Sequence, residues 1–326
     1  MKRLITLALA LILALGLVAC GTEPEPAEKI DVKVATLKGP TGIGMVQLMK
    51  NAEEGTAKNN YTFSLESAPD AIQGLIVNGD VQIAAVPTNL AAALYKKTNG
   101  AIQVAAVNTL GVLHIIENGN TINSVEDLRG KTIYATGQAS TPEYILNYVL
   151  TKSGLTPGVD VTVEYMSEHS ELATALASGT VAIGMLPEPN VTSATNQNKD
   201  LRIAIDLTAA WEAACGEGNV PVQGCIVVQK EFAENNKAAL DAFLEEYAAS
   251  VNFVNESTDD ASALVETYGI MAKAALAKKA IPNCNIVFKT GDEMKTMLSD
   301  FFKVLFDANP KSIGGALPDD AFYYKK

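Results

Sequence analysis

The pattern of hydrophobic and polar positions repeats along the chain at a fixed offset of 100 residues. Residues 34–87 can be laid over residues 134–187 without a gap, and ten of these 54 positions are identical. Other pairs exchange one apolar residue for another, as in Ile72 and Leu172. A period this long is not a solenoid repeat of 20–50 residues. It indicates two copies of one supersecondary block and therefore two similar lobes, and a cleft between two lobes is the usual place for a small ligand.

Each copy carries the hydrophobic pattern of strand, turn, helix, strand, helix, strand. The predicted strands are residues 32–35, 61–65 and 81–86 in the first copy and residues 132–135, 161–165 and 181–186 in the second. The predicted helices include residues 70–77, 143–151 and 170–177. Helices between strands favour parallel pairing, with helices on both faces of a sheet. We therefore predict an α/β fold with two lobes, each a mostly parallel sheet flanked by helices.

The chain beyond residue 226 does not continue the repeat. Apolar residues at helical spacing predict long amphipathic helices after Lys230 and around Phe301. Residues 224–229 predict a strand that returns to the first sheet, so the chain crosses between the lobes twice, near residues 109–113 and 208–224. Two crossings predict a hinge. We assign residues 31–110 and 224–326 to the first lobe and residues 111–223 to the second.

The N-terminus has the pattern of a bacterial lipoprotein signal. Lys2 and Arg3 precede an unbroken apolar run to Ala19, and Cys20 follows at the cleavage point. A transmembrane anchor or an ordinary signal peptide is the alternative, but the run is shorter than the ~20 residues that span a bilayer. We predict a signal peptide over residues 1–19, a lipidated Cys20 carrying palmitate, and a polar, Pro-rich tether over residues 20–30. The protein is then expected at the cell membrane, held by its lipid alone on the extracytoplasmic side.

The charge balance is acidic. The formal net charge is −12, and removal of Lys2 and Arg3 with the signal peptide changes it to −14. Such a surface disfavours nucleic acid as a partner. With two His residues and no Cys-x-x-Cys pair, the sequence indicates no metal site.

Three cysteines lie beyond Cys20. Cys215 and Cys225 are close enough in sequence to form one disulfide, which would leave Cys284 free. The alternative is that all three are small hydrophobic residues without a covalent partner.

Four phrases of the sequence, together with the lipoprotein signal, resemble a known family. They are Thr-Leu-Lys-Gly-Pro-Thr-Gly at residues 36–42, residues 122–133, Pro187-Glu188-Pro189, and residues 310–318. In this order and spacing they resemble the substrate-binding lipoproteins of ABC importers, in particular the nitrate, sulfonate, taurine and thiamine-precursor group.

The resemblance implies a monomeric two-lobed clamshell of the type II periplasmic-binding-protein kind, with two hinge crossovers. Such a protein traps a small molecule and delivers it to a membrane permease that a cytoplasmic ATPase drives; it is no enzyme and needs no cofactor. Many relatives have an aromatic residue before the residue that corresponds to Glu188. Pro187 stands there in this sequence, so the stacking that an aromatic ring would give is in doubt.

Candidate ligand contacts lie where the first strand of each copy ends and a helix begins. Ligands in open α/β sheets lie beyond the carboxyl ends of the strands, and the free amides at a helix start attract negative charge. The predicted contacts at these turns are Leu37, Gly39, Pro40, Thr41 and Gly42 in the first lobe, and Gln138, Ser140 and Thr141 in the second. Plain helix capping is the alternative for each of them.

The remaining candidates follow later strands or lie in the crossovers. Thr88 and Asn89 occupy the positions that match Glu188 and Pro189, and a carboxylate held between two prolines suits a hydrogen-bonding partner for a ligand. A solvated loop is the alternative for Glu188. The other predicted contacts, in the crossovers, are Asn108, Thr109 and Trp211. Trp211, the single Trp of the chain, could equally be a core residue.

The arginine content bears on the ligand. Only Arg129 and Arg202 remain after the signal is removed, and neither lies at a predicted pocket loop, so a bidentate clamp on a sulfonate or phosphonate is not expected. Together with Glu188, this favours a neutral or cationic ligand such as a heterocyclic, nitrogen-bearing vitamin precursor over a sulfonate. The alternative functions are an extracellular enzyme of related fold that acts on a pyrimidine-like or aromatic substrate, and a structural or signalling lipoprotein.

Overall fold

The computed structural model describes residues 29–325. The predicted signal peptide, Cys20 and all but the last two residues of the tether lie outside the described residues. Residues 31–325 belong to one compact unit. Within the described part, no helix combines the length and the apolar character that crossing a membrane requires.

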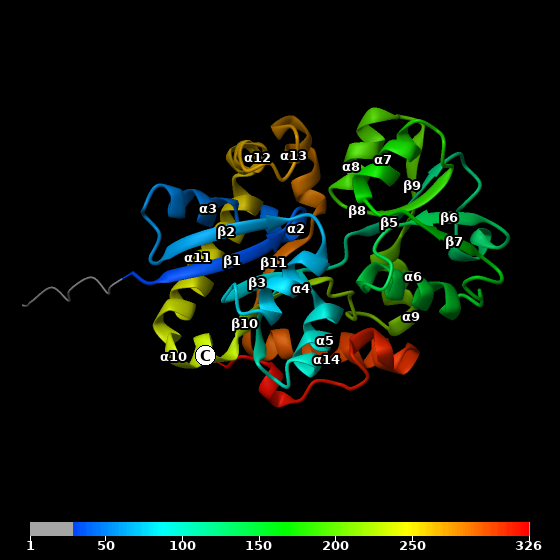
Figure 1. The fold of residues 1–326 in the computed structure, drawn as a ribbon. Coiled ribbons are helices and arrows are strands. Elements are labelled where there is room, and N and C mark those ends of the chain that lie inside the picture. The colour runs from blue at the N-terminus through cyan, green and yellow to red at the C-terminus, as the bar shows by residue number, and fades with distance from the viewer. Residues whose placement is uncertain (1–28, 326) are drawn as a thin grey trace, which may run out of the picture. The chain divides into compact units, whose positions relative to one another are not determined.

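The strands form two sheets, both visible in Figure 1. The first has the order β11-β4-β10-β3-β1-β2, with β1 (Asp31–Leu37), β2 (Asn60–Glu66), β3 (Ile83–Pro87), β4 (Ile102–Thr109), β10 (Gly224–Gln229) and β11 (Ile286–Lys289). The second has the order β7-β6-β8-β5-β9, with β5 (Leu113–Asn118), β6 (Thr132–Ala135), β7 (Thr162–Tyr165), β8 (Ile183–Pro187) and β9 (Leu201–Asp206).

The structure confirms the duplication. Strands β1, β2, β3 and β4 correspond to β6, β7, β8 and β9, and they occupy the same places in the two sheets. In each sheet, one strand that is not part of the repeat fills the matching gap, namely β10 in the first and β5 in the second. In each lobe, this inserted strand is the first one that the chain forms after it crosses from the other lobe.

The sheets are mixed but most of their strands run in one direction, which confirms the predicted fold class: β1, β2, β3 and β4 share a direction in the first sheet, and β6, β7, β8 and β9 do so in the second. β1 pairs parallel with β2 and β3, and β6 pairs parallel with β7 and β8. β10 and β5 pair antiparallel with both of their neighbours. These two strands are entered from the opposite sheet and not through a helix on their own sheet, so the βαβ connection that favours parallel pairing is absent there.

Helices cover the sheets in the order that the repeat predicts. The helices are α2 (Pro40–Ile43), α3 (Val46–Glu53), α4 (Pro69–Val77), α5 (Thr88–Lys97), α6 (Thr141–Lys152), α7 (His169–Ala177), α8 (Asn190–Gln197), α9 (Leu207–Cys215), α10 (Lys230–Asn235), α11 (Lys237–Glu256), α12 (Thr258–Thr267), α13 (Ala274–Ala280) and α14 (Gly291–Ala308). Four short 3₁₀ turns are η1 (Val125–Leu128), η2 (Ile281–Asn283), η3 (Pro310–Ile313) and η4 (Asp320–Phe322).

The first helix of each copy differs in continuity. In the second copy it is the unbroken α6, whereas in the first copy it is split into α2 and α3 at Gly44 and Met45. Gly42 and Gly44 account for the split, because glycine is about 1 kcal/mol less favourable than alanine inside a helix.

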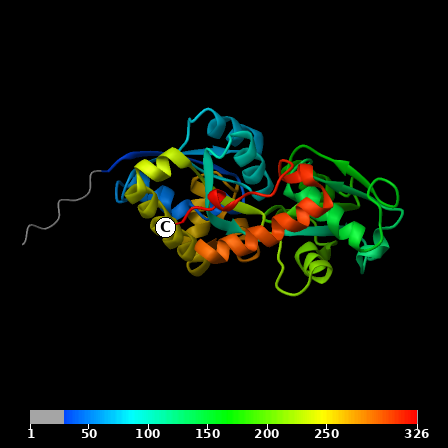
Figure 2. The same ribbon diagram turned by 90° about the horizontal axis from the view of Figure 1, so that it is seen from below.

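Helix α14 joins the two halves of the structure through its side chains. Its Phe301 ring lies 5.3 Å from the ring of Trp211 in α9, and Trp211 lies 4.7 Å from Tyr148 in α6. Nearer its start, Lys295 forms an ion pair with Asp320 beside the first sheet. Figure 2 shows α14, in orange, running along elements of both sheets. One hydrophobic cluster therefore contains residues of both sheets.

The two crossover segments are hydrogen-bonded to each other. The Gln223 N–H donates to the Thr109 carbonyl at 2.9 Å, and the Val112 N–H donates to Gln223 Oε1 at 2.7 Å. Asn285 holds the first crossover from the other side, because its carbonyl accepts from the Leu110 N–H at 3.2 Å and its side chain donates to the Gly111 carbonyl at 3.1 Å.

We expect Gly111→Ala to destabilise the fold. A Cβ at this position would lie 2.1 Å from Thr208 Oγ1 and 3.0 Å from Thr208 Cβ, so the crossover would have to move, at a cost of about 1–3 kcal/mol. The matched control is Gly74→Ala in α4, where a Cβ has no neighbour within 4 Å and the helix should gain slightly. Chemical denaturation of the two variants checks this, and equal stability would contradict the crowding.

Candidate functional site

At the start of α2, the predicted contact residues interact mainly with one another. Gly39 precedes the helix with a φ of 136°, a backbone conformation that favours glycine, and Pro40 occupies its first turn. Thr41 is 9% exposed, and its hydroxyl donates to the Leu37 carbonyl at 3.3 Å. A Cβ on Gly42 would lie 2.6 Å from the same carbonyl, so this turn has no room for a larger residue.

The start of α6 is bonded to the other half of the molecule. Asn89 in α5 accepts from the Thr141 N–H at 3.2 Å and from its hydroxyl at 2.8 Å. The Asn89 amide in turn donates to the Ser312 carbonyl at 3.4 Å. The structure thus brings together two predicted contacts from opposite lobes, but they bind each other.

The neighbouring amides of α6 are also engaged. The Ala139 N–H donates to the Glu143 carboxylate at 2.6 Å, and the Ser140 N–H donates to the Gly137 carbonyl at 3.1 Å. The amides that were predicted to attract a ligand's negative charge therefore have acceptors within the protein.

Glu188 is buried where α8 begins. The residue is 2% exposed, which excludes a solvated loop, and its carboxylate accepts from the N–H and the hydroxyl of Thr192, each at 3.0 Å. Burial raises the pKa of Glu188, and the two bonds from Thr192 oppose that rise only in part. Burial also raises the pKa of Cys284, and the charge of Glu188 adds to that rise. Glu188 of the second-sheet half thus lies close to Cys284, which follows η2 in the first-sheet half.

Two further predicted contacts lie at the end of β4. Thr109 donates to Asn108 Oδ1 at 3.2 Å, but Asn108 Nδ2 is buried without a well-formed hydrogen bond in the part of the chain that the structure describes. The same is true of the Tyr247 hydroxyl in α11. Burial raises the pKa of Tyr247 and the Asn108 amide lowers it, so the two groups lie close together. The sequence does not single out Tyr247, because a Tyr at a helical core spacing gives no sign that its hydroxyl lies beside Asn108.

Two other predicted contacts are fully buried and form hydrogen bonds within the protein. Thr88 is fully buried and donates to the Val222 carbonyl at 2.5 Å. Trp211 is also fully buried, and its indole N–H donates to Asn219 at 3.3 Å. The expectation that Trp211 caps a ligand is therefore corrected: it is a core residue, because its rings pack between α6 and α14.

The proposed disulfide is also corrected. Cys215, Cys225 and Cys284 are all free. Cys225 is buried inside β10 of the first sheet, whereas Cys215 ends α9 on the second-sheet side. Closeness in sequence does not bring the two thiols together, because the crossover between them leads from one sheet to the other.

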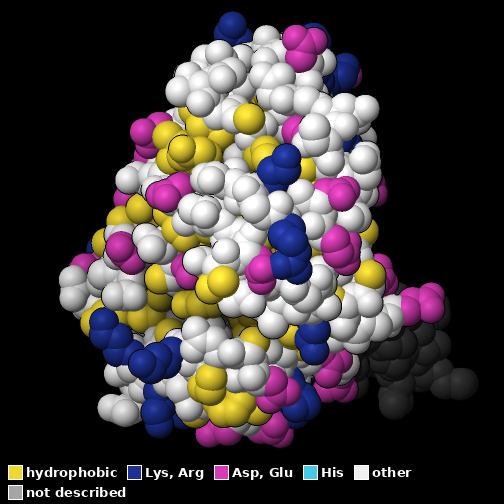
Figure 3. Space-filling model, turned by 90° about the vertical axis from the view of Figure 1, so that its right-hand side faces the viewer, with side chains coloured by type: hydrophobic (Ala, Val, Ile, Leu, Met, Phe, Trp, Pro, Cys, Tyr) yellow, Lys and Arg dark blue, Asp and Glu magenta, His cyan; other side chains and the backbone are white. Residues whose placement is uncertain are grey.

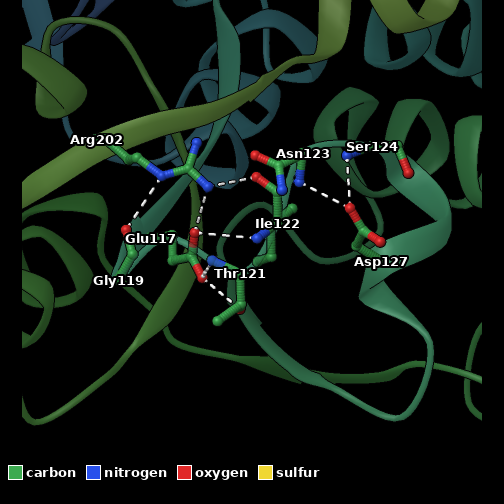
Figure 4. A network of polar contacts seen from close by, with 8 residues as sticks. All are labelled: Glu117, Gly119, Thr121, Ile122, Asn123, Ser124, Asp127 and Arg202. Carbon is green, nitrogen blue, oxygen red and sulfur yellow. Dashed lines mark hydrogen bonds and ion pairs between the residues drawn. The ribbon is translucent and has the colours of Figure 1, made fainter.

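Both arginines of the described residues form ion pairs with carboxylates that are not among the predicted ligand contacts. Arg202 pairs with Glu117 at 2.7 Å and donates through Nε to the Gly119 carbonyl at 3.1 Å, as Figure 4 shows. Burial by itself raises the pKa of Glu117, but hydrogen bonds from Thr121, Ile122 and Arg202 bring the pKa below its ordinary value. Arg129 pairs with Asp160.

The surface charge is mixed on the face that Figure 3 shows. Acidic and basic side chains alternate there with small apolar patches. This face therefore has no broad field of one sign that would attract a polyanion.

Residues 56–278 match the model of a family described as ABC transporter, phosphonate, periplasmic substrate-binding protein. No curated protein matches the chain.

Several solved structures share the fold. A structure described as an ABC transporter from Parabacteroides distasonis has 24% identity and a TM-score of 0.76, with 90% of this chain and 99% of that one covered. The periplasmic aliphatic sulphonate binding protein SsuA from Escherichia coli has 15% identity and a TM-score of 0.71, with 90% and 92% covered. The periplasmic nitrate-binding protein NrtA from Synechocystis has 11% identity and a TM-score of 0.64, with 88% and 84% covered.

Proposed function

Since the chain belongs to the phosphonate family of periplasmic substrate-binding proteins of ABC transporters, we propose that it captures an uncharged or cationic, nitrogen-bearing small molecule between its lobes. A heterocyclic vitamin precursor is the favoured class, and a sulfonate is the second candidate. As a substrate-binding component, the protein delivers its ligand to a permease and an ATPase.

The state of the two arginines carries this proposal. Recognition of a phosphonate or sulfonate usually employs a bidentate Arg or free amides at a helix start. Arg202 and Arg129 are each paired with a carboxylate, and the α6 amides have acceptors within the protein. None of the predicted contacts is a Lys or Arg. A carboxyl group, three amides and several hydroxyls suit a ligand with N–H donors and ring-nitrogen acceptors.

The contact set that we propose keeps most of the residues selected from the sequence. Asn89, Asn108, Thr109, Thr141 and Glu188 supply the polar groups near the crossovers. The two turns supply the remaining members, which are Leu37, Gly39, Pro40, Thr41, Gly42, Gln138 and Ser140. Two predicted contacts are excluded from the set: Trp211, because its rings pack between Tyr148 and Phe301, and Thr88, because its hydroxyl donates to the Val222 carbonyl. We further propose a monomer with lobes at residues 31–110 with 224–326 and at residues 111–223, anchored at the membrane by a lipid on Cys20.

The second candidate rests on a different observation. The sulphonate-binding protein SsuA from Escherichia coli shares the fold over most of both chains. The start of α2 is the one predicted turn whose amides have no side-chain acceptor from the other half among the described residues, so it could receive a sulfonate oxygen.

The enzyme alternative has less support. Burial lowers the pKa of His169 to about 4, and its Nδ1 is bonded to the Thr136 hydroxyl at 2.5 Å. Burial also lowers the pKa of His114, which lies in β5. His169 is therefore not tuned to act as a general base near neutral pH.

Glu188→Gln separates a ligand role from a structural role. Because burial raises the folded-state pKa of Glu188, its contribution to stability is present below the unfolded pKa and is lost as the pH rises through the folded value. We expect the variant to melt at or above the parent temperature at pH 7, with the difference shrinking toward pH 4. If the ligand donates a hydrogen bond to Glu188, affinity should fall by about 1.5–3 kcal/mol.

Melting curves between pH 4 and 8 without ligand, followed by titration calorimetry, check both parts. Unchanged affinity with the expected melting behaviour would remove Glu188 from the contact set. A lower melting temperature at neutral pH would show that the carboxylate is needed for the fold.

A thermal-shift screen tests the ligand class. Vitamin precursors, nucleobases, sulfonates, phosphonates and amino acids are compared, since a ligand at 100 times its Kd stabilises by about 2.7 kcal/mol. We expect a nitrogen heterocycle to give the largest shift without being consumed. Stabilisation by phosphonates alone would overturn the proposal, and conversion of a compound would favour the enzyme alternative.

A further inference from the structure

A groove of about 560 Å³ lies between α6 and α14. It is lined by Tyr144, Tyr148 and Lys152 on one side and by Val304, Leu305 and Asp307 on the other, among other residues. None of the residues predicted to contact the transported ligand lines it. Its volume is within the ~300–1,000 Å³ that small-molecule sites occupy in proteins.

The aromatic wall of the groove is the Tyr148 ring, which residues outside the groove hold in place. The Tyr148 ring lies 4.7 Å from Trp211, which is fully buried, and its hydroxyl is within hydrogen-bonding reach of the Cys215 thiol. Val304 and Leu305 face it from α14. The Tyr148 ring is already fixed and lies opposite aliphatic side chains. It therefore suits a flat aromatic ligand, because stacking on it would cost little further side-chain entropy.

The groove also contains Lys152, a cation that forms no ion pair with the described residues, while Asp307 lines the opposite side. Lys152 Nζ lies 5.4 Å from the centre of the Tyr148 ring. No carboxylate within ion-pair distance holds Lys152 among residues 29–325, and Asp307 is paired with Lys303 at 2.8 Å. A single anionic group on a ligand would therefore meet Lys152 beside the aromatic wall.

We propose that this groove is a second small-molecule site, which takes a flat aromatic carboxylate. The ring lies along Tyr148 opposite Val304 and Leu305, and the carboxylate pairs with Lys152. The site is independent of the ligand that the protein transports. Because its walls come from helices that pack on different sheets, a bound molecule contacts both.

Titration calorimetry with two probes of equal shape tests the charge preference. The full chain is titrated with 2-naphthoate and with the neutral 2-naphthamide. We expect naphthoate to bind about fivefold more tightly, the upper range for an exposed ion pair. Lys152→Met should abolish this preference, whereas Lys97→Met, an exposed Lys in the last turn of α5, should leave it unchanged. An unchanged preference in Lys152→Met would overturn the proposal.

A variant that fills the groove locates the binding. Ala308 lines the groove and is exposed, so Ala308→Trp should block both probes, and an unchanged melting temperature shows that the variant is folded. Full naphthoate binding by Ala308→Trp would place the probe elsewhere and overturn the site. Absence of naphthoate binding to the parent protein at millimolar concentration would do the same.

Discussion

Trp211→Ala should lower the free energy of unfolding by about 3–5 kcal/mol, the range for removing a large aromatic side chain from a core. Trp211 is fully buried and its ring contacts both Tyr148 and Phe301. Its removal would separate α9 from α14 and leave Asn219 without the indole donor. Chemical denaturation measures the loss directly.

The control for this prediction is Trp211→Phe. Phenylalanine keeps most of the ring contacts and loses only the indole N–H, so its loss of stability should be clearly smaller than that of alanine. A variant Trp211→Ala of parental stability with weakened ligand binding would reverse the assignment, and Trp211 would again be a ligand contact.

Arg202→Met should cost about 2–3 kcal/mol of stability at neutral pH. Glu117 is 3% exposed and Arg202 31% exposed, so the change leaves a buried carboxylate without its cation. Breaking a fully buried pair costs about 3–5 kcal/mol, and partial exposure and the remaining bonds from Thr121 and Ile122 reduce this. Arg129→Met is the matched control, since Arg129 is 57% exposed in its pair with Asp160, and it should change stability little.

The loss in Arg202→Met should also depend on pH. The folded-state pKa of Glu117 is lowered, so its stabilisation is present above the unfolded value of about 4.5 and is lost as the pH falls through the folded value. Removing Arg202 raises that folded pKa, so the difference between parent and variant should shrink in acid. A difference that stays constant from pH 7 to pH 3 would mean that packing, and not charge, accounts for it.

The sequence predicts the repeated parts of the fold well, because a pattern that occurs twice supports each assignment twice. The strands and helices of the two copies appear in the predicted order. The places of β10 and β5 were not predictable from periodicity, since they depend on which sheet the chain enters after each crossover. Antiparallel pairing at these strands follows from that topology and leaves no mark in the hydrophobic pattern.

The candidate site was predictable in composition but not in pairing. Asn89 and Thr141 were both selected from local patterns, yet nothing in either turn indicates that one binds the other across the two halves. The flanking prolines predict a rigid Glu188, but nothing in the local sequence indicates that this carboxylate is buried. The sequence leaves open whether Trp211 is a ligand contact or a core residue, because the rings that bury it come from α6 and α14, which are distant from α9 in sequence.

The bond between Asn89 and Thr141 sets a condition on any incoming ligand. If the two halves separate, the start of α6 loses the acceptor for the Thr141 N–H and hydroxyl, and water takes its place. A ligand that binds there must replace the hydrogen bonds between Asn89 and Thr141. Its measured affinity is therefore reduced by the free energy of the contact that it displaces. Asn89→Ala would remove this internal competitor for Thr141, but it would also remove the contact that Asn89 itself is proposed to make with the ligand.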